Sequence, residues 1–116
     1  MKNRERLRQR YLQDLLPVRL AGLAVSLGRV ASSARRATGG AATAAMLEES
    51  LYLIEWTAAE APDELAGDLA DVQVMLALWR RAWPEVQHSP LQRSILAVQA
   101  KQWGDQILRQ VAEYVR

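Results

Sequence analysis

The chain has 116 residues, half of them apolar, and a formal net charge of +2. This length suits a single domain, and so much apolar material argues against a disordered chain. The absence of cysteine excludes disulfides and thiol nucleophiles, and a reducing cytoplasm is the compartment that fits best. No apolar run approaches the ~20 residues of a membrane span, so we expect a soluble protein with no membrane contact. The charged start, "MKNRERLRQR", has no apolar segment behind it and does not predict a signal peptide.

Charge is unevenly distributed along the chain. Residues 1–36 contain nine basic residues and two acidic ones, whereas residues 41–75 contain eight acidic residues and no lysine or arginine. A basic first segment and an acidic middle segment attract each other. We therefore expect them to pair, either within the fold or across a subunit interface.

Residues 3–37 predict a long first helix with a break or a kink at Pro17, because a proline inside a helix removes a hydrogen bond and clashes with the preceding turn. At about 100° per residue, the apolar side chains fall on one stripe, which predicts a core face. The stripe consists of Leu16, Leu20, Leu23, Leu27, Val30 and Ala34. Residues 1–10 form either a basic arm or a frayed helix start, because chain termini are often poorly ordered.

The segment "ARRATGGAAT", residues 34–43, raises the question of a phosphate site. Backbone N–H groups of a glycine-rich turn bind anions, and here Arg35, Arg36, Gly39 and Gly40 would contact one. A Walker loop, however, needs a preceding strand, four residues between its glycines and a Lys-Ser or Lys-Thr pair. The same residues suit a plain turn, in which a left-handed glycine ends the helix and the arginines favour its negative end. We favour the turn.

Residues 41–60 predict the second helix, with an apolar core face and an acidic opposite face. The core face consists of Met46, Leu47, Leu51, Leu53, Ile54 and Ala58. The opposite face, which we call the acidic–aromatic face, consists of Glu48, Glu49, Tyr52, Glu55, Trp56 and Glu60. Because amphipathic aromatic side chains are enriched at binding hot spots, this face predicts a subunit or partner interface. The alternative is that part of the first helix or a loop covers it.

Residues 63–83 and 90–115 predict the third and fourth helices. "SPLQ" predicts a capping box at the start of the fourth helix, with Ser89 as the N-cap. Asp68 projects near the apolar sector of the third helix, so we expect it to pair with Arg19 or Arg93, because an unpaired buried carboxylate is costly. The predicted core faces are Leu65, Leu69, Val72, Leu76, Trp79 and Trp83, then Leu96, Ala100, Trp103, Ile107, Val111 and Tyr114.

Short connections between long amphipathic helices imply antiparallel neighbours. The sequence therefore predicts an all-α protein, a single domain over residues 1–116 that folds as an up-and-down antiparallel four-helix bundle. Catalysis has little support, since the one histidine, His88, lies in a predicted loop and no Glu-x-x-His pair is present. We expect no catalytic residues, no metal and no cofactor, and we expect that the protein is not an enzyme.

Residues 47–83 contain Glu48-Glu49-Ser50, then Ile54-Glu55-Trp56-Thr57, and then a helix that ends in paired tryptophans. On these features the segment resembles a group of small all-helical proteins of cyanobacteria that have no assigned function. The resemblance covers about a third of the chain. It implies a helical fold and carries over no catalytic or ligand-binding residue.

These observations predict a small helical adaptor or regulator that binds proteins and self-associates as a homodimer. Tyr52, Trp56, Glu48, Glu49 and Glu55 would form the contact surface. Its complement, in a second copy or in another protein partner, would be the four arginines of the first helix, namely Arg4, Arg6, Arg8 and Arg10. The alternative is nucleic-acid or anion binding through the basic N-terminal helix. The near-neutral net charge and the acidic middle of the chain argue against nucleic acid.

Overall fold

The computed structural model describes residues 2–115; residues 1 and 116, which the predicted domain includes, lie outside the described residues. Within residues 2–115 the chain forms five helices and no strand. They are α1 (Lys2–Gln13), α2 (Leu16–Ala34), α3 (Gly40–Ala58), α4 (Asp63–Val86) and α5 (Pro90–Tyr114). The all-α prediction is confirmed for this part of the chain. The predicted count of four helices is wrong, because the predicted first helix is in fact two helices.

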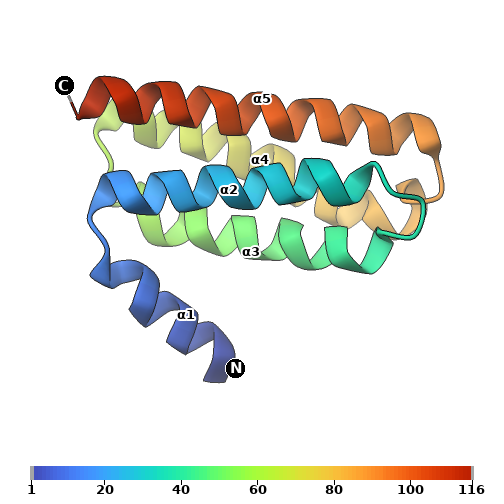
Figure 1. The fold of residues 1–116 in the computed structure, drawn as a ribbon, viewed down its shortest axis with the longest axis horizontal. Coiled ribbons are helices and arrows are strands. Elements are labelled where there is room, and N and C mark those ends of the chain that lie inside the picture. Colours follow the sequence, from blue (N-terminus) through green and yellow to red (C-terminus); the bar gives the residue numbers. More distant parts are fainter. Residues whose placement is uncertain (1, 116) are drawn as a thin grey trace.

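The chain leaves the helical conformation at Asp14 and Leu15, and Pro17 stands in the first turn of α2. A proline fits the first turn of a helix, where its missing N–H would have no partner, but it is unfavourable in the interior. Pro17 therefore starts a helix instead of kinking one, and the break precedes it. The consequence is that α1 turns away from the line of α2 (Figure 1).

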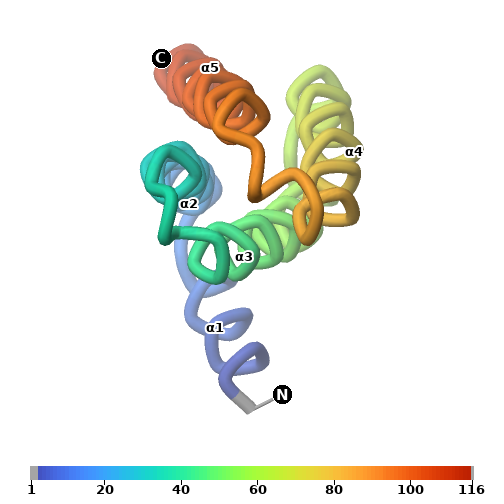
Figure 2. The backbone as a smooth tube through the Cα atoms, turned by 90° about the vertical axis from the view of Figure 1, so that its right-hand side faces the viewer, coloured from blue at the N-terminus to red at the C-terminus, as the bar shows by residue number. Residues whose placement is uncertain are grey.

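Helices α2 to α5 lie side by side, and successive helices run in opposite directions (Figure 1). Seen along their length in Figure 2, they form the four corners of one body, and α1 lies outside it, below α3. Helix α2 packs most closely against α5 and α3, and α3 packs against α4. Helices α4 and α5 approach each other least of these neighbouring pairs, so their facing sides are the most open part of the body.

The core is made by the apolar stripes that the helical spacing predicts. All six residues of the α2 stripe, from Leu16 to Ala34, are buried. The other buried residues of the predicted stripes are Leu47, Leu53, Ile54, Leu65, Leu69, Val72, Leu76, Trp83, Leu96, Ala100 and Ile107. Trp79 and Trp103 are half-buried, and Tyr114 is exposed, so its assignment to the core is wrong. Tyr114 lies in the last turn of α5 and lines an open hollow at the start of α4.

Three polar contacts recur along the seam between α2 and α3. Ser33 accepts a hydrogen bond from Thr43 at 2.8 Å, and the hydroxyls of Ser26 and Ser50 lie 2.8 Å apart. Seven residues before Ser26 on α2 and seven after Ser50 on α3, Arg19 and Thr57 are joined through the hydroxyl of Tyr11. The seven-residue spacing keeps these groups on one face of each helix, and the antiparallel direction matches them in reverse order. These buried polar pairs fix the register of α2 against α3.

The turn between α2 and α3 depends on Gly39 and Gly40, but not for the reason that the sequence suggests. No residue from 2 to 115 has a positive φ, so the prediction of a left-handed glycine is wrong. A Cβ atom on Gly39 would lie 2.3 Å from the carbonyl oxygen of Ser33, and one on Gly40 would lie 2.0 Å from Oε1 of Gln87. The Nε1 of Trp83 also donates to the Gly40 carbonyl at 2.8 Å. Gly39 is therefore needed for close approach of the backbone, whereas a Cβ on Gly40 would meet only the side chain of Gln87.

Candidate functional site

Helix α1 is held against the rest of the chain by a row of aromatic rings between two arginines. The guanidinium of Arg4 lies 4.1 Å from the centre of the Tyr52 ring, and Tyr52 stacks on Trp56 at 5.7 Å between centroids. Trp56 contacts the ring of Tyr11 at 6.1 Å, and the guanidinium of Arg19 lies 6.0 Å from the centre of the Tyr11 ring. Since these residues come from α1, α2 and α3, the row, which we call the aromatic ladder, joins three helices.

Tyr11 is the buried end of the ladder. Its hydroxyl donates to the carbonyl oxygen of Arg19 at 3.0 Å and lies against the hydroxyl of Thr57. Thr57 in turn donates to the carbonyl oxygen of Leu53 at 2.6 Å. Burial raises the pKa of Tyr11 above the usual 10.0, an effect that the hydrogen bond to Thr57 and the charge of Arg19 oppose. The protonated hydroxyl is therefore part of the contact between α1 and α3.

Arg19 is only 5% exposed although it is charged. Its Nη2 pairs with the carboxylate of Glu60, and its Nη1 donates to the carbonyl oxygen of Trp56 at 3.4 Å. The predicted pair between Arg19 and Asp68 is therefore wrong. Arg19 lies in the first turn of α2, and the antiparallel arrangement places the end of α3 beside it.

The other predicted partner of Asp68 is wrong as well. Asp68 faces α5, where its carboxylate accepts a hydrogen bond from the side-chain amide of Gln110. The Nη1 of Arg93 donates to the carbonyl oxygen of Gln87 at 3.0 Å and so holds the connection between α4 and α5. Asp68 is thus bound to a neutral partner, which the charge pattern of the sequence does not indicate.

Glu48 is the carboxylate at which three helices meet. It lies 3.5 Å from Arg4 of α1 and 3.4 Å from Arg80 of α4, and it accepts a hydrogen bond from the hydroxyl of Tyr52 at 3.3 Å. Glu49 is half-buried and Glu55 is exposed, and neither forms an ion pair with any other described residue. The predicted acidic–aromatic face is therefore contacted by arginines of the same chain, Arg4 and Arg80 at Glu48 and Arg19 at Glu60.

The remaining arginines of α1 lie apart from this contact. Arg8 lies 3.7 Å from Glu5 on its own helix. Arg6 and Arg10 are exposed and have no carboxylate at ion-pair distance among residues 2–115. The structure thus brings one of the four predicted arginines, Arg4, to the acidic–aromatic face and leaves Arg6 and Arg10 facing solvent.

In the segment that raised the question of an anion site, two backbone N–H groups donate within the turn. The N–H of Gly39 donates to the carbonyl oxygen of Arg36 at 3.0 Å, and the N–H of Thr43 donates to that of Gly39 at 2.8 Å. Arg35 and Arg36 are exposed. The amides of Gly39 and Thr43 therefore serve the turn itself, as the interpretation of this segment as a plain turn requires.

The structure also locates the groups that bear on chemistry and membranes. Within residues 2–115, no three His, Asp or Glu side chains gather closely enough to hold a metal ion. His88 is exposed in the connection between α4 and α5. In the same part of the chain, every helix is either too short or too polar to cross a bilayer.

A surface that the sequence analysis missed lies on α4 and α5. Six apolar side chains of these neighbouring helices are exposed. They are Val74, Met75 and Leu78 from α4, and Leu91, Ile95 and Val98 from α5. We call these six residues the α4–α5 apolar surface. Trp79 lies between the two groups and donates from Nε1 to Oε1 of Gln99 at 2.8 Å. Shallow hollows lie on either side, one beside Leu78 and one beside Ile95. A second apolar stripe on each helix, away from the core stripe, is the signal that would have identified it.

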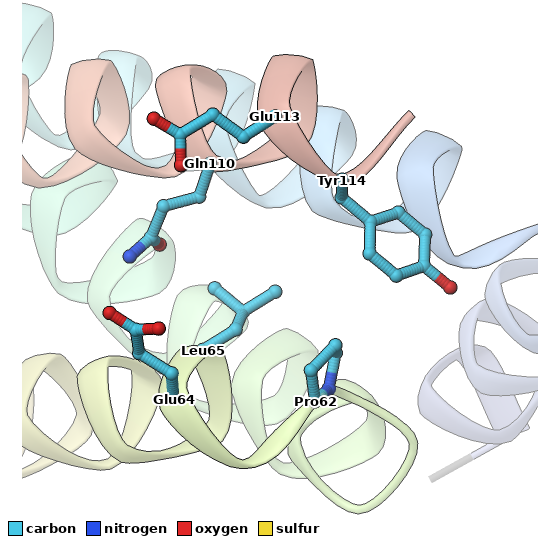
Figure 3. A pocket seen from close by; sticks show the side chains of 6 residues that line it. All are labelled: Pro62, Glu64, Leu65, Gln110, Glu113 and Tyr114. Carbon is cyan, nitrogen blue, oxygen red and sulfur yellow. The ribbon is translucent and has the colours of Figure 1, made fainter. Parts of the chain in front are cut away.

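The opposite end of the same seam is polar. Figure 3 shows a shallow hollow there, lined by Pro62, Glu64 and Leu65 at the start of α4 and by Gln110, Glu113 and Tyr114 at the end of α5. Its lining includes the carboxylates of Glu64 and Glu113 and the amide of Gln110, and its one leucine, Leu65, is buried. The seam between α4 and α5 therefore changes from acidic and polar at this end to apolar near the α4–α5 connection.

Comparison of the chain with protein-family models, with curated proteins and with solved structures finds no match.

Proposed function

We propose that this chain is a cytoplasmic, non-enzymatic protein–protein interaction module, a small helical adaptor or regulator that self-associates. The observation that carries the proposal is the α4–α5 apolar surface. Single exposed apolar side chains are common on proteins, but a contiguous apolar patch with a polar rim marks an interaction site. Here six such side chains stand on two adjoining helices, and acidic residues border them toward the start of α4.

This proposal moves the contact surface from α3 to α4 and α5. Tyr52 and Trp56 are half-buried and stack within the aromatic ladder, so a partner would have to compete with α1 for them. Val74 and Leu78 are 60% and 55% exposed, and covering them displaces only water. Contact through α4 and α5 therefore requires no rearrangement of the chain.

The proposal is tested by the solution mass of the protein, measured by light scattering across a wide range of concentration. The variant Leu78→Glu places a charge in the middle of the α4–α5 apolar surface and should give a monomer. Leu108→Glu is the matched control, because Leu108 is also exposed, at 47%, but lies on the side of α5 that faces α2. A wild-type protein that is monomeric at every concentration contradicts self-association, and equal effects of the two variants contradict the choice of surface.

A second candidate function is nucleic-acid or anion binding through the basic N-terminal helix. The observation that favours it is that Arg6, Arg10 and Arg29 are exposed and have no ionic partner among residues 2–115. Clustered arginines bind phosphates with an affinity that falls steeply with salt. Binding of short DNA or RNA duplexes at low salt, lost on removal of residues 1–10, is the expected result, and no binding at low salt contradicts this function.

A further inference from the structure

The outer face of α4 carries a regular pattern that the core does not explain. Moving along the helix in alternating steps of four and three residues, this face presents Gly67, Asp71, Val74, Leu78, Arg81 and Glu85. All six are exposed. Figure 2 shows α4 at a corner of the four-helix body, with α3 and α5 on its two sides. Alternating steps of four and three are the spacing by which one helix packs along another.

We propose that this face binds α4 of a second copy of the chain, in the antiparallel direction, about a two-fold axis level with Leu76. The inference rests on the proposed function and specifies its occupant and geometry. Around that axis, Val74 of each copy lies opposite Leu78 of the other, which gives an apolar centre. Asp71 of each copy lies opposite Arg81 of the other, which gives an ion pair on each side of it.

Charge selects this arrangement over the parallel one. In a parallel pairing, Asp71 would lie opposite Asp71 of the second copy, and Arg81 would lie opposite Arg81. Like charges would then meet on both sides of the apolar centre. In the antiparallel pairing the same two residues form two complementary pairs, because a two-fold axis repeats every contact. Like charges at an interface are costly and opposite charges fix its register. The pattern is therefore self-complementary in one direction only.

Among residues 2–115, Asp71 and Arg81 have no ionic partner that explains their place on this face. They stand ten residues apart on one helix, or about 15 Å at a rise of about 1.5 Å per residue, so they do not pair with each other. Neither forms an ion pair with any described residue. In the proposed pairing each of them acquires an opposite charge.

The neighbouring residues are compatible with a second helix in this position. At the ends of the pairing, Glu85 lies opposite Gly67, and no atom lies within 4 Å of where a Cβ of Gly67 would be. On the α5 side, Met75 and Leu78 line one shallow hollow and Ile95 and Val98 line another, and Trp79 of the first donates a hydrogen bond to Gln99 of the second. The α4–α5 apolar surface thus extends the proposed contact and adds apolar area to it.

Charge reversal tests the geometry. Asp71→Arg places two arginines opposite each other at both ends of the apolar centre, and Arg81→Asp places two aspartates there. Each single variant should weaken dimerisation by at least about tenfold, measured by analytical ultracentrifugation at low salt. The double variant, which exchanges the two charges, should dimerise as the wild type does. An equimolar mixture of the two single variants should form a heterodimer, because its two chains are complementary.

Arg29→Asp is the control for charge reversal, since Arg29 is exposed on α2 and has no ionic partner among residues 2–115; it should leave the dimer unchanged. Circular dichroism of every variant checks that the helices are intact. If Leu78→Glu disrupts the dimer but neither charge reversal does, this geometry is wrong and the proposed function still holds. If the wild type is a monomer and binds another protein through this face, the second copy is not the occupant. If the wild type is a monomer and no variant changes its association with any protein, both proposals are overturned.

Discussion

The guanidinium of Arg4 lies 4.1 Å from the centre of the Tyr52 ring and 3.5 Å from the carboxylate of Glu48, so one side chain of α1 makes both an ionic and a cation–π contact with α3. At the other end of α1, the hydroxyl of Tyr11 reaches Thr57. Two points of attachment about two turns apart hold a short helix that by itself would be marginally stable in water. The docking of α1 is therefore expected to depend on a few identifiable side chains.

Replacing Arg4 with alanine should loosen the first half of α1 without unfolding the body. The side chains of Arg4 and Glu48 are 44% and 37% exposed, so solvent screens the pair, and together with the cation–π contact it contributes about 1 kcal/mol. Amide hydrogen exchange of residues in α1 should become faster, while that of α2 to α5 stays unchanged. Arg6→Ala is the matched control, because Arg6 is exposed and has no such contact among the described residues. Equal exchange in the two variants would show that the contact of Arg4 does not hold α1.

Replacing Tyr11 with phenylalanine should cost more than replacing Arg4. The ring remains, but the hydroxyl of Thr57 and the carbonyl of Arg19 lose a buried hydrogen-bond partner, a loss of about 1–2 kcal/mol. The free energy of unfolding, measured in urea, should fall by this amount. Thr57→Val, which keeps the shape and removes the other hydroxyl, should have a comparable effect. An unchanged midpoint in both variants would contradict the proposed role of this contact.

The stability of the protein should fall at alkaline pH because of Tyr11. Its pKa in the folded protein is raised above the usual 10.0, whereas the unfolded chain titrates near that value. As the pH rises through 10.0, the unfolded state loses this proton first and the folded state keeps it, so the free energy of unfolding decreases. Unfolding curves from neutral pH to beyond that value should show a steeper decline for the wild type than for Tyr11→Phe. Parallel declines would mean that Tyr11 ionises as easily in the folded state as in the unfolded one.

The contact between Ser26 and Ser50 should behave as a coupled pair. Ser26→Ala or Ser50→Ala alone leaves one buried hydroxyl without its partner and should cost about 1–2 kcal/mol of unfolding free energy. The double variant removes both hydroxyls and should cost less than the sum of the two single variants. Thermal or urea unfolding of the four proteins measures the coupling. Strict additivity would indicate that each hydroxyl has another partner.

Gly39 and Gly40 should differ in their tolerance of a methyl group. In Gly39→Ala the new Cβ meets a backbone carbonyl, which moves only with the helix, so we expect a loss of about 1–3 kcal/mol. In Gly40→Ala it meets the end of the Gln87 side chain, which rotates away, so we expect a loss below about 1 kcal/mol. The melting temperatures of the two variants give the comparison. A larger loss for Gly40→Ala would reverse this assignment.

The sequence by itself determined the parts of the fold that rest on local chemistry. The spacing of Leu20, Leu23 and Leu27 predicts a buried face of α2, and all three are fully buried. "SPLQ" predicts the start of α5, where the side chain of Ser89 accepts from the N–H of Gln92 at 3.2 Å. Helical periodicity and capping depend on residues close together in the chain, so the sequence alone predicts them. The uneven charge likewise indicated that the basic segment and the acidic segment attract each other.

Only the tertiary structure decided which of these charges meet and which apolar faces stay uncovered. Arg19 pairs with Glu60 and not with Asp68, because that choice depends on where antiparallel helices place their ends. Val74 and Leu78 remain exposed, because they lie on the outer face of α4, opposite the residues that this helix buries in the core. The distances between helices depend on how all the core side chains, including large ones such as Trp83, pack together. The candidate interaction surface therefore became visible only once the four helices had been placed.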